Sequence, residues 1–239
     1  MQRYFIDRNQ IKENIVVIDG QDVHHIKDVM RNKLNDKLIL NTYDGSLYLS
    51  TITSIDKKSI VLEIIEEIKS DWKPLNLDLG ISLIKKDNFE LILQKVTELG
   101  VNKVIPLKTQ RSIIKLDDFS KKKLRYQTIL KEASEQSERT MIPEIADYLN
   151  LEDLKNLNYD HKYFCYAREE NNNIKCILEP FNANESTLVL IGPEGGFSDE
   201  EIKSLEKSGF TSISLGKTIL RAETAAIYVA SIFRYLTEE

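Results

Sequence analysis

Residues that commonly bind metals or form disulfides are scarce in this chain. Its 239 residues include two cysteines and three histidines. Cys165 and Cys176 are too few for a disulfide framework, and we expect both to be free thiols in a reducing compartment. The cysteines and the three histidines (His24, His25 and His161) show neither C-x-x-C nor H-x-x-x-H spacing. No metal site is therefore expected.

Long hydrophobic runs are also missing. No apolar stretch approaches the roughly 18 residues that a membrane span needs. The first ten residues turn polar after a few positions and do not resemble a secretory signal peptide. These absences predict a cytoplasmic protein. The 41% apolar and 30% charged residues are enough for a buried core and a solvated surface, which excludes a disordered or low-complexity chain. The length predicts one large domain or two smaller ones.

Positive charge is concentrated in one part of the chain, although the formal net charge is −5. Residues 103–131 contain nine lysines and arginines but only two acidic residues, Asp117 and Asp118. Two interpretations stay open. The segment is either a lysine-rich solvated helix surface or a local basic face that binds RNA phosphates.

The first 72 residues have the pattern of a small β-rich domain. The Asp44-Gly45 pair between two β-rich runs predicts a hairpin. Apolar residues at helical spacing predict a short helix within 23–30, and Trp72-Lys73-Pro74 has the composition of a linker. The predicted strands cover 3–6, 15–18, 37–40, 47–50 and 59–68.

From residue 73 onward, strand patterns alternate with helix patterns, which predicts an α/β domain with a mostly parallel sheet covered by helices on both faces. Asp87 with Glu90 predicts a capping arrangement at one helix start, and Ser198 with Glu201 predicts a capping box at another. A long helix is expected over 117–139. The predicted strands cover 77–84, 104–107, 161–166, 187–191 and 212–215.

Two segments join a strand to a helix through an unusual loop. In the first, Val189–Ser198, three glycines within five residues let the backbone turn tightly and approach a ligand closely, at the strand ends where open α/β sheets bind ligands. The loop is neither G-x-G-x-x-G nor G-x-x-x-x-G-K-[ST], which disfavours a dinucleotide site and a P-loop. The alternative is a connection that needs glycines for its turn geometry alone.

The second segment, Leu215–Ala226, places Ile219 and Leu220 in a loop, where either a ligand or the core would have to cover their apolar side chains. Glu223 follows near the expected helix start, where the helix dipole is a sufficient structural reason for a carboxylate.

Together these segments resemble the SPOUT methyltransferases, most closely the RsmE family, and the similarity extends over essentially the whole chain. Its most specific parts are Ile191–Ser198 and Leu220-Arg221 with Glu223–Ala225. The similarity also includes Thr97–Val101, Thr109–Ser112, Glu132-Ala133, Glu135–Ser137 and Arg139. The N-terminal pieces, Arg3–Phe5, His24-His25 and Val29–Arg31, would be weak on their own. Asn88 and Thr218 stand where the family usually has arginine, and Ala222 where it usually has threonine.

The resemblance implies an N-terminal PUA-like β-barrel that binds RNA, residues 1–72, and a SPOUT methyltransferase domain with a C-terminal trefoil knot, residues 73–239. It implies a homodimer that uses S-adenosyl-L-methionine to methylate N3 of a uridine in 16S rRNA of the small ribosomal subunit. Two alternative hypotheses stay open. One is another SPOUT RNA methylation, such as ribose 2′-O methylation, and the other is a non-catalytic RNA-binding or ribosome-assembly protein.

The resemblance also implies site residues. Arg111 and Arg221 would stabilise negative charge on the uracil, and Glu223 would accept the proton from N3. Their structural alternatives are a phosphate clamp, a salt-bridge partner and a helix-end charge, respectively. The expected cofactor-binding residues are Leu190, Ile191, Gly192, Gly195, Gly196, Leu215, Gly216 and Leu220. The expected RNA-binding residues are Arg3, His25, Arg31, Lys33, Lys121, Lys122, Lys123 and Arg125.

Overall fold

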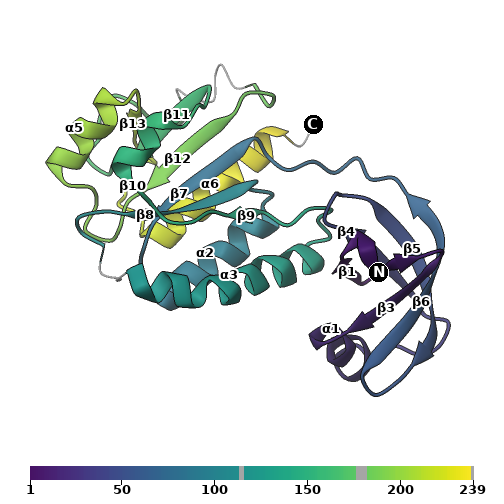
Figure 1. The fold of residues 1–239 in the computed structure, drawn as a ribbon. Coiled ribbons are helices and arrows are strands. Elements are labelled where there is room, and N and C mark those ends of the chain that lie inside the picture. The colour runs from purple at the N-terminus through teal and green to yellow at the C-terminus, as the bar shows by residue number, and fades with distance from the viewer. Residues whose placement is uncertain (113–115, 176–181, 238–239) are drawn as a thin grey trace. The chain divides into compact units, whose positions relative to one another are not determined.

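The computed structural model describes residues 1–112, 116–175 and 182–237 and divides the chain into two compact units (Figure 1). The first unit contains Met1–Lys73 and Lys131–Ile142. The second contains Pro74–Leu130 and the chain from Pro143 onward. From the sequence, residues 73–239 were expected to form one domain; in the structure, residues 131–142 group with the first unit.

Contacts of the helix α3 (Leu116–Gln136) explain this grouping. The ammonium of Lys131 donates to Asp22 at 2.7 Å and lies 3.2 Å from Glu135. A carboxylate oxygen of Glu135 accepts the N–H of Phe5 at 3.0 Å. Burial raises the pKa of Glu135 despite its lysine neighbour. The last turns of α3 are therefore held to the helical turn at Asp22 and to the strand at Phe5 by contacts between residues more than a hundred positions apart.

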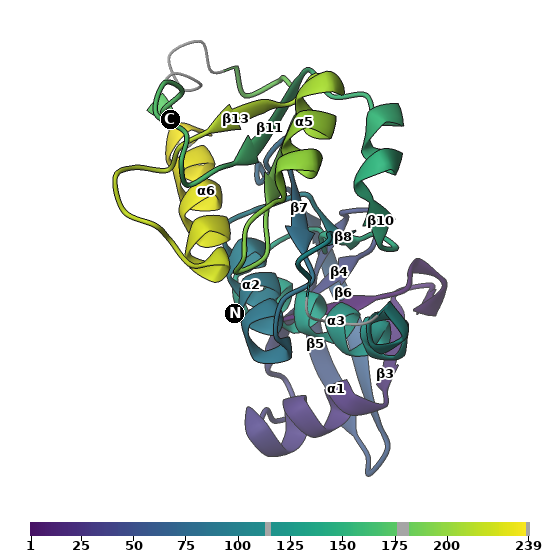
Figure 2. The same ribbon diagram turned by 90° about the vertical axis from the view of Figure 1, so that its left-hand side faces the viewer.

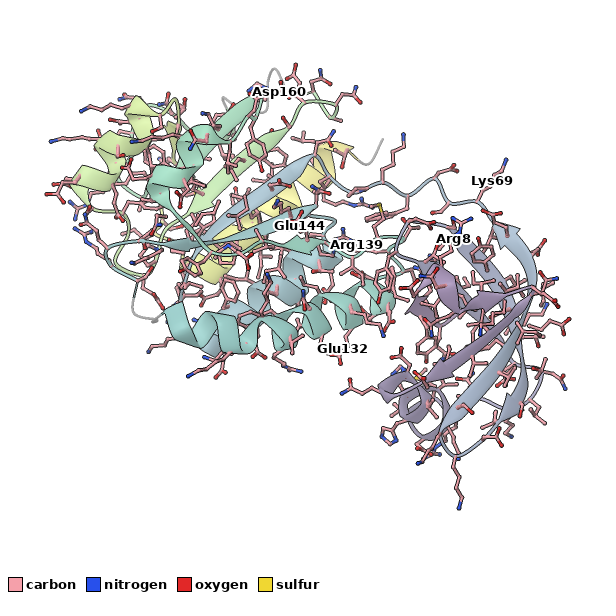
Figure 3. All side chains as sticks on the ribbon, viewed as in Figure 1. Arg8, Lys69, Glu132, Arg139, Glu144 and Asp160 are labelled. Carbon is pink, nitrogen blue, oxygen red and sulfur yellow. The ribbon has the colours of Figure 1, made fainter. Side chains whose placement is uncertain are left out.

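The segment after α3 is held to the same unit. The side-chain amide of Asn41 donates to the carbonyl of Arg139 at 2.7 Å. Arg139, labelled in Figure 3, is fully buried, and its guanidinium lies 4.8 Å from the ring centroid of Trp72. This cation–π contact joins the segment to the residues where the chain first leaves the unit.

The first unit is a half-barrel built from one six-stranded sheet in the order β1-β4-β5-β6-β3-β2. Its strands β3 to β6 are labelled in Figure 2. The strands are β1 Arg3–Ile6, β2 Ile11–Lys12, β3 Ile15–Asp19, β4 Lys37–Thr42, β5 Leu47–Ile55 and β6 Ser59–Ile68. The helical turns are η1 Arg8–Gln10, α1 Gln21–His24 and the π-helical η2 His25–Val29. The predicted hairpin at Asp44-Gly45 is confirmed, with Gly45 at φ +90° in the turn. Because β1 and β2 stand at the two edges, the sheet does not form the closed barrel that was expected.

The second unit contains a parallel sheet, as predicted, in the order β10-β8-β7-β12-β11-β13, with β9 pairing with β8. Its strands are β7 Leu77–Ser82, β8 Lys103–Lys108, β9 Glu144–Ile145, β10 Leu149–Asn150, β11 His161–Cys165, β12 Thr187–Ile191 and β13 Thr211–Ile213. Its helices, besides α3, are α2 Lys86–Glu98, η3 Leu151–Asn156, α5 Asp199–Lys207 and α6 Ala222–Thr237. All five residues of β12 are buried, which shows that both faces of the sheet are covered there.

One predicted helix cap is confirmed and one is wrong. Ser198 and Glu201 form the expected capping box at the start of α5. At α2, however, the helix begins at Lys86 without a side-chain cap. Glu90 instead forms an ion pair with Arg125 of α3 at 3.3 Å, so packing between two helices decides its place.

Within these described ranges, no helix is long and apolar enough to cross a membrane, and no group of three histidine, cysteine or acidic side chains is arranged to hold a metal. Cys165 is a free thiol at the end of β11, and burial raises its pKa to about 12. Cys176 lies outside the described residues.

Candidate functional site

The loops of interest follow parallel strands of one sheet and therefore open at the same edge of that sheet. They comprise residues 109–112 after β8, 166–174 after β11, 192–198 after β12 and 214–221 after β13. In open α/β sheets this carboxyl edge is where ligands bind. The structure thus brings both sequence-predicted loops to one side of the second unit.

The glycine loop, residues 192–198, needs its glycines for its own geometry. Gly196 adopts φ +65° and donates its N–H to the carbonyl of Pro193 at 2.8 Å, which closes a tight turn. A Cβ atom on Gly192 would lie 3.2 Å from the ring of Phe197, and one on Gly195 would lie 3.3 Å from the side chain of Arg111. The preceding Leu190 and Ile191 are buried at the end of β12.

Arg111 holds the glycine loop from the neighbouring loop after β8. Its Nη1 donates to the carbonyl of Gly195 at 2.7 Å and to that of Phe197 at 3.2 Å. A phosphate clamp is not needed to explain this arginine, because two backbone carbonyls already accept from it. Its expected part in stabilising charge stays a prediction.

Glu201 makes a second connection between the same two loops. Its carboxylate is buried, with Oε1 accepting the N–H of Gln110 at 2.7 Å and Oε2 accepting the N–H of Ser198 at 2.8 Å. The sequence pattern identified the contact to Ser198, since it lies within a capping box. It gave no sign of the contact to Gln110, which is 91 positions away.

The loop after β13 is paired along part of its length with the loop after β11. The N–H of Ser214 donates to the carbonyl of Asn172 at 2.8 Å, and the N–H of Ile174 donates to the carbonyl of Ser214 at 2.9 Å. Residues 166–174 contain no glycine motif, so the sequence gives no signal that they belong to the site. Beyond this pairing, Gly216 has φ +131°, and the side chain of Ile219 is 82% exposed. The core therefore does not cover Ile219.

Leu215 and Leu220, expected to bind the cofactor with Gly216, are half-buried in this loop. Arg221 ends it and accepts the N–H of Ala225 at 2.8 Å, as the first carbonyl of α6. Its side chain is exposed, and Glu223 is half-buried in the first helical turn. In the part of the chain that the structure describes, neither side chain forms a hydrogen bond or ion pair. Both are therefore available to a ligand.

Four predicted RNA-binding residues lie in the first unit. Arg3 is largely buried, its side chain 14% exposed, and it pairs with Glu138 at 3.0 Å. That ion pair leaves Arg3 little surface to offer RNA. His25, Arg31 and Lys33 are exposed.

The other four predicted RNA-binding residues lie on α3 in the second unit. Lys121 is exposed and Lys122 is half-buried. Lys123 is ion-paired with Asp147, and Arg125 with Glu90. The basic stretch is thus partly neutralised by acidic neighbours that its sequence does not reveal.

Comparison with known proteins matches both units. A family described as the RNA methyltransferase domain matches residues 71–234, and one described as the RNA methyltransferase PUA domain matches residues 18–65. Ribosomal RNA small subunit methyltransferase E from Bacillus subtilis is 35% identical, with 100% of this chain and 98% of that protein covered. The protein of the same name from Mesomycoplasma hyopneumoniae is 36% identical, with 96% and 97% covered.

A solved structure is also similar over nearly its full length. It is a ribosomal RNA small subunit methyltransferase E from Neisseria gonorrhoeae bound to S-adenosyl methionine. The TM-score is 0.88 at 27% sequence identity, with 99% of this chain and 98% of that chain covered.

Proposed function

Because the chain belongs to the ribosomal RNA small subunit methyltransferase E family, we propose that it transfers the methyl group of S-adenosyl-L-methionine to N3 of a uridine in 16S rRNA. The observation that carries this proposal is that the two predicted loops open at one sheet edge, with Arg111 hydrogen-bonded to the carbonyls of Gly195 and Phe197 in the first of them. Because Arg111 fixes the glycine loop, the loop can bind a cofactor in the one orientation that methyl transfer needs.

The residues at this edge suit S-adenosyl-L-methionine. In the described part of the chain, the N–H groups of Glu194 and Gly195 form no hydrogen bond, so they are free to donate to a ligand. The exposed side chain of Ile219 offers apolar surface to an adenine ring. When bound, the cofactor supplies a methyl group on a sulfonium sulfur. The remaining expected contacts come from Leu190, Ile191, Gly192, Gly196, Leu215, Gly216 and Leu220.

The protein's own groups would act on the uracil. Its neutral N3–H is a poor nucleophile and has to lose its proton, and Glu223 is the proposed acceptor. Negative charge then develops on the uracil oxygens, where a guanidinium stabilises it. Both arginines are exposed. Arg221 suits this role better, because its side chain forms no hydrogen bond among the described residues, whereas Nη1 of Arg111 already donates to two carbonyls.

RNA binding is proposed for those predicted residues of both units that form no ion pair among the described residues. His25, Arg31 and Lys33 would contact RNA from the half-barrel, and Lys121 and Lys122 from α3. Contacts between these cations and phosphates release counterions, so binding should weaken steeply with salt. Arg3 is left out of this set because it is largely buried in its pair with Glu138.

Three finer features are proposed on the resemblance. They are a trefoil knot in the C-terminal part of the second unit, a homodimer, and a site of action in the cytoplasm, where ribosomes assemble. The homodimer is tested by sedimentation equilibrium, in which a monomeric mass at micromolar concentration would contradict it.

Methyl transfer from labelled S-adenosyl-L-methionine to small ribosomal subunits lacking the modification tests the function. Nucleoside mass spectrometry should then identify 3-methyluridine. Label in a ribose 2′-O-methylated nucleoside would instead establish the rival methylation. If the protein does not bind the cofactor at all, the alternative hypothesis of a non-catalytic RNA-binding protein is favoured.

A further inference from the structure

Two connections between the loop after β8 and the glycine loop form a closed ring. Starting at Glu201, Oε1 accepts the N–H of Gln110. The next residue, Arg111, donates to the carbonyls of Gly195 and Phe197. The chain then continues to Ser198, whose N–H donates to the other oxygen of Glu201. Each loop is thus held at two points by the other.

Helix capping alone does not account for the carboxylate of Glu201. A capping box needs one oxygen, which reaches the N–H of the capping residue. Here the second oxygen is 2.7 Å from an N–H of a different loop, and the residue is 7% exposed. Burying a carboxylate is unfavourable unless hydrogen bonds compensate for the lost hydration. The bond to Gln110 supplies part of that compensation, so it is a strong, charge-assisted contact.

The position of Arg111 depends on this bond. Because Gln110 immediately precedes Arg111, anchoring its N–H fixes the backbone from which the guanidinium extends. The turn from Thr109 to Ser112 adds local rigidity, since the two hydroxyls are 2.7 Å apart and the N–H of Ser112 donates to the carbonyl of Thr109 at 3.1 Å. The guanidinium then holds the carbonyls on either side of Gly196.

We propose that Glu201 is a positioning residue for cofactor binding: its carboxylate ties Gln110 to Ser198 and thereby holds Arg111 against the glycine loop. Glu201 itself does not touch the substrate or the cofactor. The inference rests on the proposed function, because the ligand whose binding it affects is S-adenosyl-L-methionine.

Glu201→Asp separates this role from helix capping. Aspartate keeps the negative charge and can still cap, as the Asn150–Asp153 capping box at η3 shows in this same chain. It is one methylene shorter, so it does not span from Ser198 to Gln110. Glu200→Asp is the matched control. Glu200 is exposed in the same helical turn and accepts the side-chain amide of Gln110 at 3.4 Å, not its N–H, so shortening it leaves the bond between the Gln110 N–H and Glu201 in place.

The experiment measures hydrogen exchange of backbone amides and the Kd for S-adenosyl-L-methionine by calorimetry, both on the full chain. In Glu201→Asp we expect the Gln110 amide to lose protection while the Ser198 amide keeps it. Loss of one charge-assisted contact should raise the Kd about tenfold, with kcat at saturating cofactor within about twofold of the wild type. Glu200→Asp should match the wild type in every measurement.

The outcomes separate this inference from the proposed function. Unchanged protection of Gln110, or an unchanged Kd when that protection is lost, would overturn the positioning role alone. Equal weakening by Glu200→Asp would assign the effect to the helix terminus and overturn it as well. A wild-type protein that does not bind S-adenosyl-L-methionine would overturn the proposed function, and the inference with it.

Discussion

The phenol oxygen of Tyr4 lies 2.9 Å from Nδ1 of His25, and the two rings meet edge to face. Tyr4 is buried in the core of the half-barrel, whereas His25 is exposed. Burial, together with the carboxylates of Glu135 and Asp22, raises the pKa of Tyr4, so its hydroxyl keeps its proton. In the tautomer that accepts this proton at Nδ1, His25 carries its own hydrogen at Nε2 and is ready to donate to RNA.

Replacing Tyr4 with phenylalanine should therefore weaken RNA binding without removing any residue that touches RNA. We expect the Kd for 16S rRNA to rise by up to about tenfold, and the free energy of unfolding to fall by about 1 kcal/mol through loss of one hydrogen bond. Filter binding and urea unfolding measure the two effects. Tyr43→Phe is the control, because Tyr43 is an exposed tyrosine of the same unit. An unchanged Kd for RNA in Tyr4→Phe would contradict the idea that Tyr4 orients His25 for RNA binding.

The hairpin turn predicts a pH-dependent stability. Asp44 accepts hydrogen bonds from Thr42, Arg8 and the N–H of Ser46, which hold its pKa well below the usual range. A carboxylate with a lowered folded-state pKa stabilises the protein above its ordinary pKa of about 3.9, and that contribution is lost as the pH falls through the lowered value.

Asp44→Asn should consequently have a lower free energy of unfolding than the wild type at pH 7. The difference between the two free energies should become smaller as the pH falls below about 4. Urea unfolding across this pH range measures that difference. Asp71→Asn, at an exposed position of the same unit, is the charge-matched control. A difference in the free energy of unfolding that stays constant from pH 7 to pH 3 would contradict the stabilising role of the ionised Asp44 carboxylate.

Salt dependence distinguishes the cations of α3. Lys121 is exposed, whereas Lys123 is paired with Asp147. If Lys121 contacts a phosphate, Lys121→Ala should reduce the slope of log K against log salt by about 0.7–0.9. Asp147→Asn should release Lys123 and steepen the slope by a similar amount. Binding titrations from 50 to 200 mM salt measure these slopes. A slope that changes in neither variant would contradict the phosphate contact.

A packing prediction concerns Gly80 on β7, which pairs with Leu190 on β12. A Cβ atom on Gly80 would lie 2.4 Å from a methyl group of Leu190, closer than any real contact. Gly80→Ala should reduce the free energy of unfolding by about 1–3 kcal/mol through overpacking. Leu190→Ala removes the methyl group concerned, so a double-mutant cycle should show that the two changes are not additive. If the losses in free energy of unfolding of the two single variants add up in the double variant, the strain does not come from the contact with Leu190.

Several features followed from short stretches of sequence. The Asp44-Gly45 hairpin, the Ser198 capping box and the parallel sheet were all predicted correctly, because hydrophobic spacing and turn chemistry act between neighbours in the chain. The glycines at 192–196 also identified the loop correctly as a tight turn at a strand end.

Only the tertiary structure decided which residues meet across long stretches of chain. Arg111 and Gly195 are 84 positions apart, Gln110 and Glu201 are 91 apart, and Asp22 and Lys131 are 109 apart. The same cause made the capping prediction at Asp87 wrong, since Glu90 is held by Arg125 from another helix. A buried carboxylate or guanidinium takes its partner from whatever donors and acceptors the packed elements bring within about 3 Å. That set is determined by the order of the strands and the packing of the helices, and no local pattern in the sequence encodes it.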